Sequence, residues 1–385
     1  MFAIRGELHS AGFDRARIRE FIAKEDLAAL VLTSPENVFY ATGYSALPSS
    51  GNPILYSLRN VFPYAVVMSR AGDRHLLCWG FSVEDVGVDA EEIIPFNDRA
   101  EAMEKLRQEV AASLNGPLER PLRVAVEDSC PHEVTHLISS LGHVELTSAN
   151  PILHALRRRK TEREVGLLLR SVEIAEGALE RVIGSLRVGS SRLDAIRLAK
   201  TSVLELGGDG VGHVTMSFGQ ANPEIAIDEP LREGALVVVD VGAKYAGYTS
   251  DCRRYAFVGE RVPRIVLEQH DAMCAVVDEV AGAMRPGVSF ADLTKLGRQG
   301  FASRNIPLLG RFTHVGHGIG LETEEEWIDD DESRSIEEDM VVAIELYAAA
   351  GDHGAVGDEE TYVIRADGPQ QLSQSERSIR TLIPA

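Results

Sequence analysis

The sequence is poor in cysteine and has neither a long apolar run nor an excess of positive charge. Its four cysteines are widely spaced and form no C-x-x-C pair, which argues against a disulfide framework and against a zinc knot. No apolar stretch approaches the roughly 20 residues that span a bilayer, and residues 1–12 do not resemble a secretion signal. We therefore expect a cytoplasmic protein with no membrane partner.

Negative charge is in excess, with 59 acidic side chains against 39 Lys and Arg and a formal net charge of -20. Such a chain would repel nucleic acid, so we expect no nucleic-acid partner. The 385 residues are too many for one ordinary core. We predict two domains, 1–152 and 153–385.

Helical and strand-like patterns alternate in the first domain. An amphipathic helical pattern at 14–25 precedes the apolar run 27–33. Further strand-like runs lie at 62–68, 75–79 and 122–126, with a helical pattern at 100–111. This alternation predicts an α/β domain in which helices cover a sheet. The basic run 156–160 after it is interpreted as a solvated linker.

The second domain carries acidic residues where apolar strands should end. Asp240 follows an apolar run, and Asp251 comes after a Gly-containing turn that lets the chain double back. A lone carboxylate is costly to desolvate, so a cation bound by both residues would explain their position. For either residue taken alone, an Asp that faces solvent at a strand end is the alternative.

Three further segments supply imidazole or repeat the acidic pattern. Residues 313–320 read THVGHGIG, and the small residues around His314 and His317 indicate a backbone that closely approaches another group. Glu345 ends an apolar run, and Glu359 precedes another. Four carboxylates and one imidazole predict an oxygen-rich site for one or two ions of Mn, Fe, Co or Zn, and a pair of such ions would activate water.

These residues resemble the pita-bread metallohydrolases, the family that includes prolidase, aminopeptidase P and creatinase. In that family the metal ligands come in the order Asp, Asp, His, Glu, Glu, within D-x-G, S-D-x-x-R, G-H-G-x-G and two segments that carry Glu. The resemblance implies a centre of two divalent ions and cleavage of a C–N bond in a dipeptide or small amide, as in Xaa-Pro peptidases. The implied ligands are Asp240, Asp251, His317, Glu345 and Glu359.

The N-terminal half shares this resemblance. Residues 34–44 (SPENVFYATGY) and 159–165 (RKTEREV) are similar to segments of the creatinase and prolidase branch. The resemblance implies an α/β N-terminal creatinase-like domain followed by an α+β pita-bread catalytic domain. It also implies a homodimer.

Three substrate-handling features of prolidase and aminopeptidase P are absent. Residues 222–230 (NPEIAIDEP) replace a P-H-H segment, Glu324 replaces a second His, and Gly357 replaces an Arg. The missing histidines would donate protons or hold the substrate. Their absence predicts weak activity on ordinary Xaa-Pro dipeptides.

Other residues are candidates for the missing roles. The T-H-x-G-H pattern around His314 resembles creatinase, and either His213 or His353 would supply an imidazole, although a surface or loop histidine is the alternative for both. The predicted catalytic residues are His314, Glu324 and Glu345. The predicted substrate-binding residues are His213, Glu324, His353 and Tyr347.

Three classes of function are compatible with these patterns. The first is a metallohydrolase that acts on a dipeptide or small amide. The second is a metal-bound lyase or a creatinase-like non-peptide hydrolase. The third is a non-catalytic binding module on a peptidase fold, and the presence of all five ligands counts against it, because clustered carboxylates without a metal repel one another.

Overall fold

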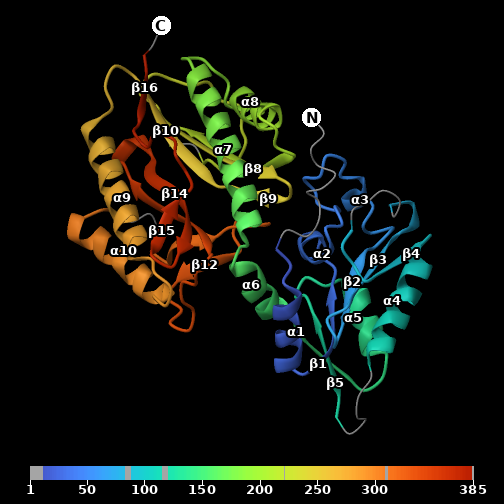
Figure 1. Cartoon of the computed structure of the whole chain (residues 1–385). Helices are drawn as coiled ribbons and strands as arrows, with labels where there is room; N and C mark the ends of the chain where they lie inside the picture. The colour runs from blue at the N-terminus through green and yellow to red at the C-terminus, as the bar shows by residue number, and fades with distance from the viewer. Residues whose placement is uncertain (1–11, 83–87, 115–119, 221, 308–310, 384–385) are drawn as a thin grey trace. The chain divides into compact units, whose positions relative to one another are not determined.

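The computed structural model describes residues 12–82, 88–114, 120–220, 222–307 and 311–383. The chain divides into two compact units, of which the first ends at Arg157 and the second begins at Arg158 (Figure 1). Each unit has its own buried apolar core. No helix among the described residues is long and apolar enough to cross a membrane.

The first unit contains a six-stranded sheet in the order β4-β3-β2-β1-β5-β6, in which β1 pairs antiparallel with β2 and parallel with β5. The strands are β1 (Leu27–Leu32), β2 (Ala65–Ser69), β3 (Arg74–Trp79), β4 (Glu92–Phe96), β5 (Leu122–Val126) and β6 (Val144–Ser148). The helices are α1 (Arg15–Lys24), α2 (Pro35–Thr42), α3 (Ile54–Ser57), α4 (Arg99–Ser113), α5 (His132–Ser139) and α6 (Asn150–Arg158). The expected α/β architecture is confirmed.

The segment 34–44 forms a capped helix held by a buried carboxylate. The Ser34 side chain accepts a hydrogen bond from the Asn37 backbone N–H, and Gly43, with φ of 73°, ends the helix in the left-handed region. Glu127 is 3% exposed, and it accepts hydrogen bonds from the Ser34 hydroxyl at 2.5 Å and from the Asn37 amide at 2.6 Å. The polar residues of this motif therefore join the β1–α2 turn to the end of β5.

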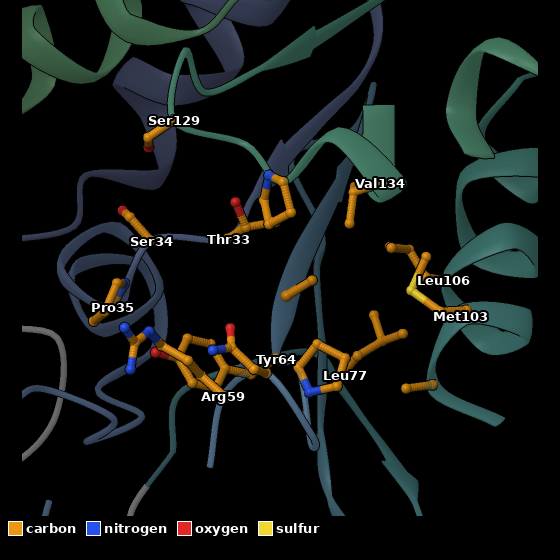
Figure 2. Close-up of a pocket in the computed structure, with 15 residues that line it drawn as sticks. Thr33, Ser34, Pro35, Arg59, Tyr64, Leu77, Met103, Leu106, Ser129 and Val134 are labelled. Atoms are coloured by element: carbon orange, nitrogen blue, oxygen red, sulfur yellow. The ribbon is translucent and has the colours of Figure 1, made fainter. Parts of the chain in front are cut away.

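A cavity of about 250 Å³ lies beside this turn (Figure 2). Its polar lining includes Thr33 and Ser34, and Met103, Leu106 and Val134 form part of its apolar lining. None of its lining residues is a predicted ligand or substrate-binding residue. This cavity therefore does not carry the expected chemistry.

The second unit contains two five-stranded sheets, each with its own pair of helices. The first sheet has the order β16-β10-β8-β7 with β9 on β8, and the second has the order β12-β11-β13-β14-β15. The strands of the first sheet are β7 (Gly210–Phe218), β8 (Leu236–Tyr245), β9 (Tyr248–Thr249), β10 (Cys252–Val258) and β16 (Arg380–Leu382). Those of the second are β11 (His314–Gly318), β12 (Glu326–Asp329), β13 (Val341–Ala349), β14 (Ala355–Arg365) and β15 (Gly368–Gln371). The helices are α7 (Glu162–Ser185) and α8 (Arg192–Glu205) on the first sheet, and α9 (Arg264–Ala283) and α10 (Phe290–Arg304) on the second.

Alternation along the strands separates the apolar core from the acidic residues. Val239 and Val241 belong to the core that α7 and α8 cover, whereas Asp240 between them points to the opposite face of the sheet. Ile344 and Leu346 likewise pack under α9 and α10 and leave Glu345 on the other face. This arrangement is the expected α+β catalytic domain.

Two expectations from the sequence are wrong. Asp240 and Glu345 lie inside strands rather than at their ends, because each strand continues past the carboxylate with the alternation intact. The basic run is not a solvated linker either. Lys160 is 4% exposed and its ammonium lies 2.9 Å from Glu325 Oε2, while Arg158 donates to Glu326 at 2.6 Å.

Candidate metal centre

The first sheet brings Asp240 and Asp251 together. Asp251 directly precedes β10, which runs antiparallel to β8, and the next residue, Cys252, pairs with Val241. The side chain of Cys252 turns to the helix-covered core, so that of Asp251 emerges on the opposite face. Both carboxylates are buried, Asp240 at 3% exposed and Asp251 at 7%.

His213 joins the same pair of carboxylates. It lies on β7 opposite Gly242, and a Cβ at that glycine would come within 2.5 Å of His213 Nδ1, so only glycine leaves space for the ring. His213 Nε2 lies 3.0 Å from Asp240 Oδ1 and 3.1 Å from Asp251 Oδ1. The structure therefore places the predicted substrate-binding His213 directly at the predicted ligands.

The second sheet contributes His317, Glu345 and Glu359. His317 on β11 is fully buried and pairs with Ala343 on β13, and Glu345 on β13 lies directly opposite Glu359 on β14. Two like charges directly opposite in a sheet destabilise it. A cation between these strands would remove that repulsion.

Four of the five predicted ligands and His213 form two overlapping groups. One group is His213, Asp240 and Asp251, and the other is Asp251, His317 and Glu359; within each, one ligand atom per residue lies within 4.8 Å of the others. Glu345 Oε1 lies 3.7 Å from His317 Nε2, beside the second group. The two sheets thus bring ligands that are far apart in the sequence to one place.

Several buried atoms of the second group lack hydrogen-bond partners within the described structure. They are His317 Nε2 and both carboxylate oxygens of Glu359. His317 Nδ1 lies 3.3 Å from the Gly318 carbonyl oxygen, so its N–H is directed to that oxygen and the Nε2 lone pair is left for a ligand. A buried imidazole lone pair beside carboxylate oxygens is a donor set that fits a divalent transition metal.

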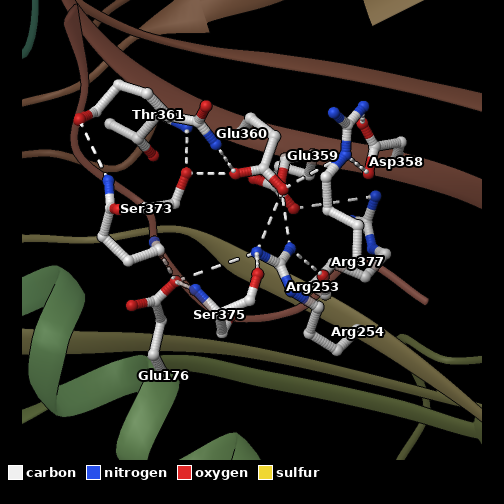
Figure 3. A network of polar contacts seen from close by, with 12 residues as sticks. Glu176, Arg253, Arg254, Asp358, Glu359, Glu360, Thr361, Ser373, Ser375 and Arg377 are labelled. Carbon is white, nitrogen blue, oxygen red and sulfur yellow. Dashed lines mark hydrogen bonds and ion pairs between the residues drawn. The ribbon is translucent and has the colours of Figure 1, made fainter. Parts of the chain in front are cut away.

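The acidic neighbours of Glu359 have closer partners than Glu359 itself (Figure 3). Asp358 is bound by Arg377, and Glu360 lies 3.0 Å from Arg254 and accepts from the Ser373 hydroxyl. All three acidic side chains are buried at 2% exposure or less. The fold therefore gives the carboxylates on either side close partners, whereas Glu359 has only the guanidinium of Arg253 at 3.8 Å and no hydrogen bond.

Burial and neighbouring charges shift the pKa values of Glu359 and Asp240 in opposite directions. Burial raises the pKa of Glu359 well above its usual value, and the Asp251 charge raises it further. Burial also acts to raise the pKa of Asp240, but Arg253 and His213 beside it outweigh burial and lower that pKa. Asp240 is thus hydrogen-bonded to cations of the chain, whereas the cation near Glu359, Arg253, lies 3.8 Å from Oε2 and makes no hydrogen bond with it.

The other predicted residues differ in their distance from this cluster. His314 and Tyr347 line a cavity of about 160 Å³ together with Glu345, and Tyr347 donates a hydrogen bond to Glu345. Partial burial raises the pKa of Glu324, which is an exposed residue and belongs to neither ligand group. His353 instead packs against Phe257, with ring centres 6.0 Å apart, and belongs to neither ligand group.

Arg253 is a member of the site that was not predicted. Its guanidinium donates to Asp240 and lies 3.3 Å from Glu345 Oε2. The signal in the sequence was its position two residues after Asp251, because residues i and i+2 of a strand share one face. Because the arginine side chain is long, the sequence did not indicate which groups it would contact.

Comparison with known proteins identifies the families of both parts of the chain. Residues 166–366 match the model of metallopeptidase family M24, and residues 15–159 match that of the creatinase/prolidase N-terminal domain. A Xaa-Pro dipeptidase of Pyrococcus horikoshii is 23% identical over 94% of this chain and 97% of its own length.

Solved structures show the same fold. A prolidase from Thermococcus sibiricus aligns with a TM-score of 0.81 at 19% identity, over 96% of this chain and 100% of its own. A Xaa-Pro dipeptidase from Bacillus anthracis aligns with a TM-score of 0.80 at 18% identity, over 96% of this chain and 99% of its own.

The M24 model covers more than half of the chain, so the chain belongs to metallopeptidase family M24, with a creatinase/prolidase N-terminal domain before the catalytic domain. It is a metallohydrolase, and its family implies divalent metal ions.

Proposed function

We propose that this metallohydrolase cleaves the C–N bond of a dipeptide or of another small amide, at a divalent ion held by Asp251, His317, Glu345 and Glu359. The observation that carries the proposal is the set of buried atoms without partners at His317 and Glu359. Their chemistry fits a metal, and leaving them unpartnered would cost the fold free energy. The location of these atoms between two sheets supports a site for a bound ion rather than for a structural hydrogen bond.

A divalent ion at this place would activate water and polarise a carbonyl group. The chain's own residues set the geometry around it. Tyr347 donates a hydrogen bond to Glu345 and fixes its carboxylate, and the Gly318 carbonyl fixes the His317 ring. In the proposed hydrolysis the oxygen of water would bond to the carbonyl carbon while a proton of that water passes to Glu345. The C–N bond would then break, and the leaving nitrogen would take a proton from His314, which would recover one from Glu345.

The substrate is proposed to be small and to carry positive charge. The relative named Xaa-Pro dipeptidase supports a dipeptide as substrate. The family resemblance, however, implies a histidine at the position where this chain has Glu324. An ionised carboxylate opposes the negative charge that develops on the substrate oxygen, whereas it attracts an amine or a guanidinium. His314, in its creatinase-like pattern, favours a creatinase-like non-peptide hydrolase as the second candidate.

The test is a panel of Xaa-Pro dipeptides, other dipeptides and small cationic amides, assayed for released amine with metal-loaded enzyme. We expect turnover of a cationic amide and weak turnover of Xaa-Pro, because loss of one stabilising donor costs about 10²–10³ in kcat. Glu324→Gln is the matched variant, and it should weaken the cationic substrates selectively. A kcat/KM for Xaa-Pro dipeptides of about 10⁴ M⁻¹ s⁻¹ or more would refute the substrate proposal.

Three finer properties belong to the same proposal. We propose Mn, Fe, Co or Zn as the metal, on the basis of the mixed imidazole and carboxylate donors. A cytoplasmic location is supported by the small number and wide spacing of the four cysteines, which form no C-x-x-C pair. A homodimer is supported by the family resemblance, and sedimentation equilibrium would test it.

A further inference from the structure

The guanidinium of Arg253 lies among the candidate ligands. It donates to Asp240 Oδ2, and its Nη1 lies 3.3 Å from Glu345 Oε2 and 3.8 Å from Glu359 Oε2. All four side chains are at most 10% exposed. Because a guanidinium stays protonated in proteins, Arg253 is a permanent cation inside the predicted metal site.

Two features of the fold hold Arg253 in this position. It lies directly opposite Asp240 in the register of β8 and β10, so the two side chains share one face of the sheet. Its guanidinium carbon also lies 4.4 Å from the centre of the Tyr347 ring, whose hydroxyl donates to Glu345. Arg253 is thus fixed by contacts from both sheets.

The atoms with and without partners divide the site into two halves. In the first half, Asp240 has a partner on each oxygen, with His213 Nε2 on Oδ1 and Arg253 on Oδ2. In the second half, His317 Nε2 and both oxygens of Glu359 have no hydrogen-bond partner among the described residues. The need for an added cation is therefore concentrated in the second half.

We propose that the centre holds a single divalent ion, bound by Asp251, His317 and Glu359 with Glu345 beside them, and that Arg253 takes the place of a second ion at Asp240. This inference rests on the proposed function, because it assumes that the site binds a metal. Arg253 is a positioning residue that keeps Asp240 and Glu345 in place.

Arg253 and a second metal ion would compete for the carboxylate of Asp240, so the two cannot be present together. A metal ion binds a carboxylate oxygen at about 2.0–2.2 Å, and Asp240 Oδ2 already accepts from Arg253. An ion on that oxygen would lie next to the guanidinium in a buried site, where like charges repel strongly. Arg253 also lines a cavity of about 580 Å³ with Tyr255 and Tyr347, so a shorter side chain would open the position to an ion from solvent.

The experiment measures metal stoichiometry and does not depend on activity. Full-length protein is stripped with a chelator, reconstituted with excess Mn²⁺, freed of unbound ion and analysed for Mn per chain. Electron paramagnetic resonance then separates isolated Mn²⁺ from a coupled pair. We expect one uncoupled ion in the wild type, one in Arg253→Lys, which keeps the charge, and two coupled ions in Arg253→Ala.

Each outcome decides the inference. Two ions in the wild type would refute it and leave the proposed function intact, whereas no ion in the wild type would refute both. One ion in a folded Arg253→Ala variant would show that Arg253 does not exclude the second ion. If Arg253→Ala fails to fold, the wild-type stoichiometry and Arg253→Lys still decide, because two ions in either would contradict exclusion by charge.

Discussion

Replacement of Glu359 by Gln is expected to stabilise the metal-free protein and to abolish its stabilisation by metal. Glu359 is 1% exposed, lies directly opposite Glu345, and has two oxygens without hydrogen-bond partners in the described structure. Gln keeps the shape of the side chain and removes the charge. The substitution therefore removes a like-charge repulsion and the larger part of a desolvation cost.

The magnitude follows from these contacts. An unpartnered buried polar group costs about 1–3 kcal/mol and a charged one more, so removal of the charge should gain at least about 1 kcal/mol. For a unit of this size that gain corresponds to roughly 2–4 °C in Tm. Metal at 100 times its Kd should stabilise the wild type by about 2.7 kcal/mol, or roughly 5–11 °C, and the variant by far less.

The assay is thermal unfolding of chelator-treated protein with and without Mn²⁺. Glu360→Gln is the matched control, because Glu360 is the buried neighbour and is already paired with Arg254 and Ser373. It should lower the Tm of the metal-free protein and keep the metal response. The reasoning is refuted if Glu359→Gln lowers the metal-free Tm, or if metal raises its Tm as much as that of the wild type.

Three further predictions concern binding, pairing and pH. Asp251→Ala or His317→Ala should lose metal by elemental analysis while the first unit keeps its own unfolding transition, and full metal occupancy would show that the replaced residue is not a ligand. Lys160→Ala should lower the free energy of unfolding by about 3–5 kcal/mol, because it leaves the buried Glu325 charge without its ammonium; a Lys160→Met, Glu325→Gln double variant that is equally unstable would contradict this. Burial raises the pKa of Glu164 despite hydrogen bonds from Thr161 and Tyr248, so the folded protein binds more protons there than the unfolded chain and loses stability as pH rises through that raised pKa. The Tm of Glu164→Gln should therefore increase relative to that of the wild type as the pH rises from 5 to 8. A difference in Tm that does not change with pH would contradict the assignment.

The sequence predicted the five ligands because their types and order resemble those of a metallohydrolase family, and because Asp240 and Glu345 also follow strongly apolar runs. A carboxylate within such a run has few explanations other than a cation or solvent, and the order of five ligands removed the ambiguity of each one. The sequence predicted Asp240 and Glu345 at strand ends, however, because the apolar run before each of them stops at the charged residue. In the fold the strands continue, since the hydrogen-bond ladder is indifferent to a charge that points to the opposite face.

The roles of His213 and Arg253 could not be predicted in the same way. His213 reaches Asp240 from another strand, and its approach depends on an irregular register near Val211 and on the absence of a side chain at Gly242. Arg253 could be assigned to the correct face, but a long flexible side chain can reach many partners from there. The burial of Lys160 was missed for a similar reason, because its partner Glu325 is distant in sequence.

The origin of the ligands in two different sheets has a mechanical consequence. Asp251 belongs to the sheet under α7 and α8, while His317 and Glu359 belong to the sheet under α9 and α10, and each sheet has its own large apolar core. A much smaller cluster, which includes Leu236, Phe257 and Val356, bridges the two. A bound ion would connect the two sheets of the catalytic domain, so metal should determine how cooperatively these two halves of the domain unfold. With the ion the halves should melt as one, and without it each half can open at its own temperature.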